Sequence, residues 1–159
     1  MLNEKIKNVA ALKRIAATLR AKGKRIVFTN GCFDILHYGH VKYLEDAKKK
    51  GDILIVGVNS DASVRRIKGK GRPVVRQEDR IRTLAGLESV NYAVIFGKET
   101  PLELIMALKP HILVKGSDWK KNNIVGAEFV LRLGGKVSTV KLSHGRSTTA
   151  LINKIAQKY

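Results

Sequence analysis

Residues 28–40 read FTNGCFDILHYGH, and they join a predicted strand to a predicted helix. The largely apolar run at 25–28 is typical of a short buried strand, and residues 41–47 repeat apolar side chains at helical spacing before Gly51 ends the pattern. A helix that begins just after Tyr38 points its free amide groups and the positive end of its dipole at the turn. The stretch therefore predicts an anion-binding strand-to-helix turn.

Two glycines and two histidines determine the chemistry of this turn. Gly31 and Gly39 lack a Cβ, so a ligand can approach the backbone closely. We expect His37 in the turn and His40 in the first helical turn, where both imidazoles can reach one phosphate group. The histidines could instead be ordinary residues at a helix start, but packing gives no reason for the glycines to occur beside them. We interpret the Cys32 thiol as a small core hydrophobe.

The chain has 159 residues, which predicts a single domain over 1–159, with residues 1–23 as a leading amphipathic helix. One cysteine cannot form an internal disulfide, no apolar run is long enough to cross a bilayer, and the first residues carry no apolar signal segment. We therefore expect a cytoplasmic protein with no membrane partner.

The formal net charge is +18, from 31 lysines and arginines against 13 aspartates and glutamates. Such a balance often marks a protein that binds nucleic acid or an anionic membrane. Here the basic residues are spread along the whole chain, and few aromatic side chains are available to stack on bases. We interpret the charge as solvated surface plus an electropositive site for phosphorylated substrates, and we expect no specific nucleic-acid partner.

Strand-like and helix-like segments alternate along the chain, as in proteins with a parallel sheet. Predicted strands lie at 25–28, 53–58, 92–96, 111–114 and 136–142, and predicted helices lie at 3–22, 40–50, 61–66, 77–88, 101–108, 128–133 and from Ser147 onward. Thr100 is expected to cap the fifth of these helices, with Pro101 at its first position. The fold class that follows is α/β, a Rossmann-like three-layer sandwich with a five-stranded parallel sheet.

Three further segments follow the carboxyl ends of predicted strands or open a helix, where α/β sheets bind anionic ligands. Residues 65–76 form a basic loop that could be plain solvated surface, but its place after a central strand favours phosphate binding. Lys115 can hold a phosphate, and Trp119 can stack on a base or pack against its own loop. Residues 147–149, Ser-Thr-Thr, open the last helix, where hydroxyls and free amides can cap the helix and also bind phosphate.

The quoted turn resembles the signature of the cytidylyltransferase-like nucleotidyltransferases, whose HxGH histidines contact the triphosphate of the nucleotide, and the resemblance extends from Lys24 to Lys154. It implies catalytic roles for His37, His40, Lys68 and Arg80, with a surface salt bridge as the alternative role of Arg80. It implies nucleotide binding by Thr29, Asn30, Gly31, Cys32, Phe33, Gly39, Asn59, Asp61, Arg72, Lys115, Gly116, Asp118, Ser147, Thr148 and Thr149. It also implies Mg²⁺ that arrives with ATP, with no metal held by the protein's own side chains.

Within this superfamily, residues 58–63 and 109–119 look most like the adenylyltransferases of ADP-heptose synthesis. The resemblance implies a homodimer that transfers AMP from ATP to D-glycero-D-manno-heptose 1-phosphate, giving ADP-heptose and pyrophosphate. The chain departs from some relatives at Leu142, where they carry arginine, and at Arg146, directly before the serine. Two alternatives stay open. One is a CTP-dependent enzyme acting on glycerol 3-phosphate or a similar phosphorylated alcohol, and the other is a non-enzymatic module that binds nucleotide or nucleic acid.

Overall fold

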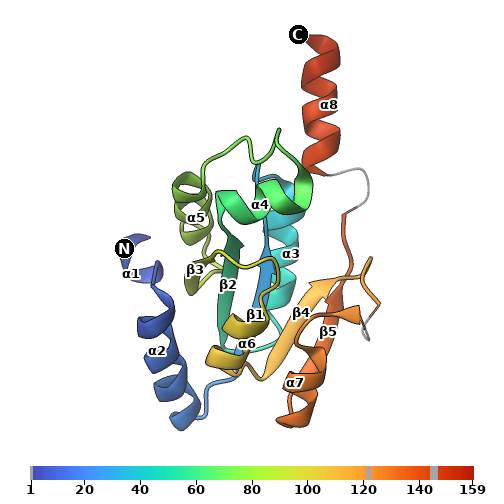
Figure 1. Ribbon diagram of the computed structural model, residues 1–159. Helices are drawn as coiled ribbons and strands as arrows, with labels where there is room; N and C mark the ends of the chain where they lie inside the picture. Colours follow the sequence, from blue (N-terminus) through green and yellow to red (C-terminus); the bar gives the residue numbers. More distant parts are fainter. Residues whose placement is uncertain (1, 121–122, 144–146) are drawn as a thin grey trace.

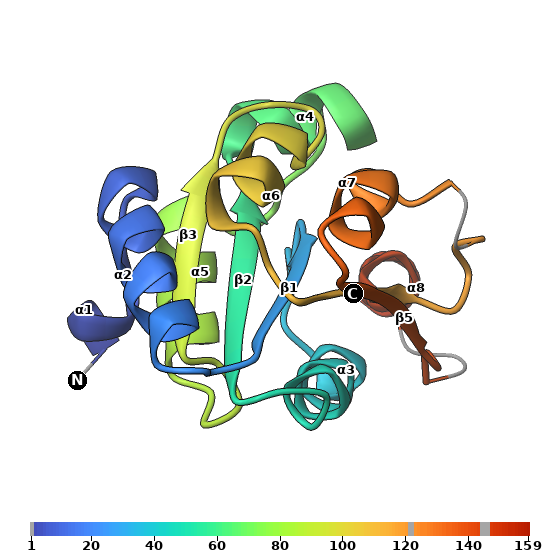
Figure 2. The same cartoon turned by 90° about the horizontal axis from the view of Figure 1, so that it is seen from below.

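The computed structural model describes residues 2–120, 123–143 and 147–159. Five parallel strands form one sheet in the order β3-β2-β1-β4-β5, with helices packed on both faces (Figures 1 and 2). The strands are β1 (Ile26–Gly31), β2 (Ile53–Asn59), β3 (Tyr92–Phe96), β4 (Ile112–Gly116) and β5 (Lys136–Val140). The helices are α1 (Leu2–Lys5), α2 (Val9–Ala21), α3 (Tyr38–Lys48), α4 (Asp61–Lys68), α5 (Gln77–Ala85), α6 (Leu102–Leu108), α7 (Ala127–Arg132) and α8 (Thr148–Lys158). The predicted Rossmann-like α/β class is confirmed.

Each face of the sheet packs against its own set of helices (Figure 2). On one face, Leu44 of α3 and Leu84 of α5 are fully buried in a cluster with Val27 of β1. On the other, Leu12 of α2 packs in a second cluster with Phe28 and with side chains of α6 and α7. Because the central strands are covered on both faces, they are apolar almost throughout, which is why the sequence predicted them.

The two central strands β1 and β4 separate toward their carboxyl ends. β1 pairs with β2 along its whole length, but it pairs with β4 only through Val27–Ile112 and Phe28–Leu113. Beyond those pairs β1 continues to Gly31 and β4 to Gly116. The chain leaves β1 for β2 on one side of the sheet and later returns to β4 on the other side. Such a change of direction is the point where open α/β sheets bind ligands.

The predicted leading helix is two helices, α1 and α2. Residues between them leave the helix because Ile6 forms a parallel bridge with Ala93 at the edge of β3, and the Lys7 amide donates to the Ala93 carbonyl at 3.0 Å. Asn8 then caps α2, with its Oδ1 accepting from the Ala11 amide at 2.8 Å. A pairing with a strand 87 residues away overrode the local helical pattern, which a sequence period alone cannot reveal.

Two other helix boundaries differ from the predicted ones. Pro101 occupies the N-cap of α6, which begins at Leu102, and no side chain caps this helix, so Thr100 does not have the predicted capping role. The helix α4 extends to Lys68, so the first part of the predicted basic loop is helical. Ser60 caps α4, with its Oγ accepting from the Ser63 amide at 3.2 Å.

The last helix, α8, extends past the carboxyl edge of the sheet, away from the layers (Figure 1). The helix has no buried residue: Leu151 and Ile152 are half-buried and Ile155 is 55% exposed, so its apolar face is largely uncovered. Over the described residues, no helix has both the length and the apolar character needed to cross a membrane.

Candidate functional site

The two histidines lie at the start of α3, as predicted. His37 is the N-cap, and its Nδ1 accepts from the Gly39 amide at 3.1 Å. The imidazole rings of His37 and His40 stack, with centroids 3.9 Å apart, and Phe33 meets the His40 ring edge-on at 5.3 Å. One imidazole therefore orders the first free amides of the helix while supporting the other, so the pair forms a fixed unit at a helix N-terminus.

His40 is electrostatically unusual. Burial, and then repulsion from His37, lower the pKa of His40 from 6.5 to about 4. Its Nδ1 is buried, and within the described chain it has no hydrogen-bond partner. A buried polar atom without a partner costs roughly 1–3 kcal/mol, and a bound ligand that supplies the partner removes this cost. His40 is therefore a neutral imidazole at pH 7, with one nitrogen ready for a ligand.

Lys115 bridges the gap between the separating strands. Its Nζ donates to the Asn30 carbonyl at 3.3 Å, and it lies 5.5 Å from the ring centroid of Trp119. Burial lowers the pKa of Lys115 to about 8, and an anionic group bound beside the amine would raise it. The side-chain oxygen Oδ1 of Asn30 is buried and, over the described residues, unpartnered. The amine of Lys115 and the amide of Asn30 therefore lie where β1 and β4 separate.

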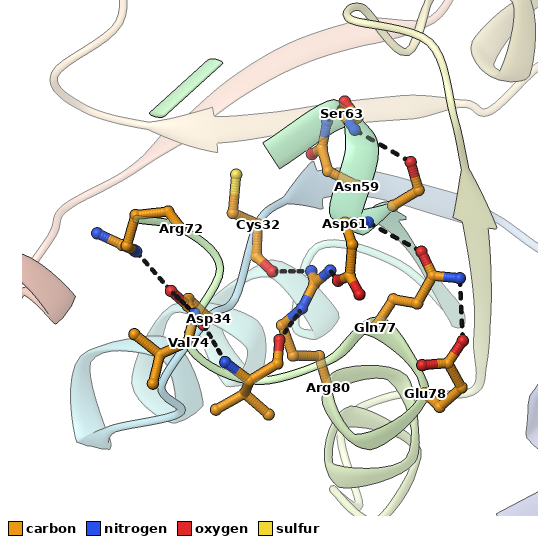
Figure 3. Close-up of polar contacts among 12 residues, drawn as sticks. Cys32, Asp34, Asn59, Asp61, Ser63, Arg72, Val74, Gln77, Glu78 and Arg80 are labelled. Atoms are coloured by element: carbon orange, nitrogen blue, oxygen red, sulfur yellow. Dashed lines mark hydrogen bonds and ion pairs between the residues drawn. The ribbon is translucent and has the colours of Figure 1, made fainter. Parts of the chain in front are cut away.

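Asp34 fixes the loop after α4 against the histidine turn (Figure 3). Its buried carboxylate accepts from the Val74 amide at 2.8 and 3.0 Å, from the Val75 amide at 2.8 Å, and from Arg72 Nε at 2.5 Å. Burial opposes ionisation, but the bonds from Val75, Val74 and Arg72 outweigh it and lower the pKa of Asp34. Sequence reasoning placed Arg72 in the site but missed the carboxylate that holds it, because the two residues are 38 positions apart.

Arg80 is a buried structural link, so the surface salt bridge given as its alternative role is not formed. Only 2% of the residue is exposed. Its Nε donates to the Val75 carbonyl at 2.9 Å, Nη1 to the Cys32 carbonyl at 2.5 Å, and Nη2 to Asp61 at 2.8 Å (Figure 3). Each nitrogen of the guanidinium is thus engaged by protein, so Arg80 joins the turn, the loop and the start of α4 instead of forming a surface salt bridge.

Three residues assigned to nucleotide binding have side chains committed elsewhere. Thr29 is fully buried, with its hydroxyl 2.7 Å from that of Tyr43, which in turn donates to the Val114 carbonyl at 3.3 Å. Asn59 is buried and donates to Ser63 Oγ at 2.9 Å. Asp61 pairs with Arg80. The side chains of Thr29, Asn59 and Asp61 therefore hold neighbouring elements together, and nucleotide binding by these residues stays a prediction.

Cys32 and Lys68 lie near each other across the loop. Burial raises the pKa of the Cys32 thiol, against the opposing charges of Lys68, Arg80 and Arg72. The thiol is therefore protonated at neutral pH, in keeping with a packing role. Lys68 itself is exposed at the end of α4, so its amine is free to swing toward the turn.

Two glycines of the site, Gly31 and Gly116, leave room for neighbouring side chains. A Cβ on Gly31 would lie 3.0 Å from the Phe33 ring, and one on Gly116 would lie 2.6 Å from Asp118 Oδ1. Phe33 itself adopts the left-handed conformation, with φ 46°, which costs on the order of 1 kcal/mol for a residue with a side chain. The turn is thus a strained segment whose ring and histidines are held in one arrangement.

The Ser-Thr-Thr segment begins α8, as predicted. Ser147 caps the helix, its Oγ accepting from the Ala150 amide at 3.0 Å, while Thr148 is half-buried and Thr149 exposed. Arg146, at which the chain departs from some relatives, lies outside the described residues. Since all five strands are parallel, the N-termini of α3 and α8 both lie at the carboxyl edge of the sheet (Figure 1).

This chain matches a family and several known proteins in sequence. The cytidylyltransferase-like family matches residues 28–146. Bifunctional protein HldE of Pelobacter propionicus is 52% identical over 157 residues, which cover 99% of this chain and 32% of that protein. HldE of Geobacter sulfurreducens is 52% identical over 155 residues, covering 98% of this chain and 32% of that protein. This chain therefore spans about a third of the length of these curated relatives.

Two solved structures have similar folds. A lipopolysaccharide core biosynthesis protein from Thermoplasma volcanium has a TM-score of 0.61 and 33% identity, over 76% of this chain and 98% of that one. A pantoate-beta-alanine ligase from Francisella tularensis has a TM-score of 0.62 at 16% identity, over 91% of this chain and 68% of that one, which shows a shared fold alone.

Proposed function

Because this chain belongs to the cytidylyltransferase-like family and is a nucleotidyltransferase, we propose that it transfers AMP from ATP to D-glycero-D-manno-heptose 1-phosphate. The products are ADP-heptose and pyrophosphate. The similarity to HldE over nearly the whole chain and to a lipopolysaccharide core biosynthesis protein supports this choice of acceptor. The assignment of ATP rests on the segments at 58–63 and 109–119, which resemble adenylyltransferases.

In the proposed reaction, a phosphate oxygen of the sugar attacks the α-phosphorus of ATP. A new P–O bond forms as the bond to the leaving pyrophosphate breaks, and Mg²⁺ enters with ATP. Little covalent help is needed from the protein, since positioning two anions and stabilising the charge that develops on the phosphoryl oxygens supplies most of the acceleration. His40, the free amides of α3, Lys115 and Lys68 would supply the donors, and Ser147 and Thr148 a second group of donors.

The strongest support comes from two buried polar atoms, His40 Nδ1 and Asn30 Oδ1, which have no partner within the described chain. Asn30 lies near the end of β1, where its carbonyl accepts from Lys115, whose pKa is about 8, and His40 lies in the first turn of α3. His40 Nδ1, at the N-terminus of α3, can donate to an anionic ligand, whereas Asn30 Oδ1 can accept only from a hydroxyl or amino group of a ligand. A domain that served only as structure would have those atoms paired.

Pyrophosphate release, measured over a matrix of nucleotides and acceptors, tests the proposal. We expect release with ATP and the heptose 1-phosphate, and little with CTP or glycerol 3-phosphate. Release with CTP and glycerol 3-phosphate instead would establish the alternative cytidylyltransferase. No release with any pair, together with nucleotide binding by calorimetry, would favour the non-enzymatic module.

We also propose that the enzyme acts in the cytoplasm as a homodimer. The uncovered apolar face of α8 supports an oligomer, because a helix with Ile155 more than half exposed leaves apolar surface in water. Sedimentation equilibrium should give twice the chain mass of 17.6 kDa, and a monomer at micromolar concentration would contradict the proposal.

A further inference from the structure

A second basic region lies at the amino edge of the sheet, opposite the histidine pair. A cleft of about 480 Å³ is lined there by Arg20, Arg25, Lys109, His111 and Lys136, with apolar surface from Leu133. Arg25, His111 and Lys136 stand at or just before the first residues of β1, β4 and β5, and Arg20 lies in the last turn of α2. The cleft is therefore separate from the candidate active site, which lies at the carboxyl ends of the same strands.

The positive charges of this cleft form no ion pair within the described residues, although the Asp52 carboxylate lies close by and accepts from the Arg25 main-chain amide at 2.7 Å. Across the described ranges, no carboxylate lies within 4.0 Å of the charged groups of Arg20, Arg25, Lys109 or Lys136. Arg20 donates to the Leu108 carbonyl at 2.5 Å, and Arg25 to the Lys50 carbonyl at 3.0 Å. Main-chain carbonyls thus hold the two guanidinium groups in place without an ion pair, and Asp52 offsets only part of the positive charge of the cleft.

His111 forms a rigid wall of the cleft. Its Nδ1 accepts from the Ile26 amide at 3.0 Å, its own amide donates to the Ile26 carbonyl at 2.9 Å, and its carbonyl accepts from the Lys136 amide at 2.8 Å. Gly135 packs so closely that a Cβ there would lie 2.7 Å from the His111 carbonyl oxygen. These contacts join β1, β4 and β5 at this edge, so the cleft is built from closely packed backbone.

Lys109 occupies an unusual backbone position. As the C-cap of α6 it has φ 47° and ψ 60°, a left-handed conformation that glycine adopts at less cost. Its neighbour Pro110 also lines the cleft. A lysine in a conformation that favours glycine indicates that its side chain has a function at this position. Lys109 lines the cleft.

We propose that this cleft binds a small molecule carrying at least two linked phosphate groups, such as pyrophosphate or a nucleoside diphosphate. The volume lies within the range of small-molecule sites. Four cations around one hollow match a compact ligand with several negative charges, whereas a nucleic acid would need a longer basic track. This site is additional to the proposed transfer site and does not depend on it.

His111 provides a local readout. Burial lowers the pKa of His111, Arg20 and Arg25 lower it further, and Asp52 acts in the opposite direction. An anion bound among these groups would raise the pKa of His111. Histidine NMR of the full chain, titrated with pH in the presence and absence of pyrophosphate, measures this directly, and the signals of His37 and His40 report the other edge separately.

The test compares two charge-matched double variants. We expect pyrophosphate to raise the pKa of His111 in the wild type, and Lys109→Gln with Lys136→Gln to weaken that response roughly tenfold while leaving the His40 response unchanged. Lys13→Gln with Lys154→Gln, which removes two exposed charges outside the cleft, should leave both responses unchanged. A parallel titration with ADP distinguishes the ligand: tighter binding than pyrophosphate would identify a nucleotide, and equal binding would identify the phosphates alone.

Two outcomes would overturn the proposal. One is a His111 pKa that does not move with either probe at millimolar concentration. The other is an equal loss of response in both double variants, because that would show a general effect of net charge on this basic chain. Thermal unfolding of each variant confirms that the fold is intact, so the comparison can be made on folded protein.

Discussion

The two edges of the sheet are both basic, but they hold their positive charges in different ways. At the carboxyl edge, Arg72 and Arg80 are tied to Asp34 and Asp61 at 2.5 and 2.8 Å. At the amino edge, the guanidinium groups are held by carbonyl oxygens and form no ion pair within the described chain, although Asp52 accepts from the Arg25 main-chain amide at 2.7 Å. An arginine paired with a carboxylate positions the backbone, whereas the positive charge of an arginine without an ion pair remains available to a bound anion. Net charge alone does not separate these two uses.

The largest expected effect is on the transfer reaction, and it follows from the loss of His40 at the carboxyl edge. His40→Ala should lower kcat by about a hundredfold or more, since removal of one donor to a developing anion has a cost of this size. Steady-state pyrophosphate release measures it. Lys136→Gln, which removes a cation from the amino edge, should turn over at the wild-type rate. Full activity in the His40→Ala protein would show that the carboxyl edge does not carry the reaction.

The role of Arg80 predicts an effect on stability. Arg80→Leu leaves the Asp61 carboxylate and two carbonyls without their donor, so we expect a loss of about 3 kcal/mol in the free energy of unfolding. Arg82→Leu, an exposed position on the same helix, should change stability by less than about 0.5 kcal/mol. Urea unfolding of both variants measures the difference. Equal stabilities would mean that the buried arginine does not link the turn to the loop.

Asp34 gives a smaller and more local prediction. Asp34→Asn keeps the shape but loses a charge-assisted bond to Arg72, which should cost about 1–2 kcal/mol and loosen the loop at 69–75. Limited proteolysis should cut that loop faster, and kcat/KM should fall. Asp46→Asn, which breaks a half-exposed pair with Lys42, is the matched control and should change stability by about 0.5 kcal/mol at most. Unchanged proteolysis would show that Asp34 does not tether the loop.

The smallest effect concerns pH. The pKa of His40 is about 4 when folded and 6.5 when unfolded, so the unfolded chain binds more protons between these values, and stability must fall as pH drops through that window. For a step from pH 6.5 to about 5.5 we expect at most about 1 kcal/mol, given partial solvent screening. The difference in unfolding free energy between wild type and His40→Gln, followed across these pH values, isolates it. A difference independent of pH would contradict the lowered pKa.

Predictions of strands and helices from the sequence were most accurate where the signal is local. The strand at 92–96 was predicted with its observed bounds, and the turn at 28–40 was placed correctly between a strand and a helix. Both follow from apolar spacing and from residue types that begin a helix. The leading helix was wrong for the opposite reason: Ile6 pairs with Ala93, and nothing in residues 1–23 records that partner.

The same distinction between local signals and long-range contacts applies to the candidate site. The sequence placed the histidines, Lys115 and the basic loop after the carboxyl ends of strands, where the structure has them, because each is a chemical type at a recognisable position. It could not show that Arg80 is buried, because the identity of a residue does not reveal whether it lies on the surface or in the core. Asp34 was part of the quoted stretch, and a carboxylate amid apolar residues was a signal for a buried tether, but its partners lie 38 to 41 positions away.

The amino-acid sequence by itself determined the α/β class, the parallel sheet and the helix that begins at an HxGH turn, since these depend on periodicity and capping within a few neighbouring residues. Only the tertiary structure decided which cations are neutralised and which are left to face a ligand. That outcome depends on contacts between residues far apart in the chain, as between Arg80 and Cys32 or His111 and Ile26. Such contacts exist only once the strands have been ordered in the sheet.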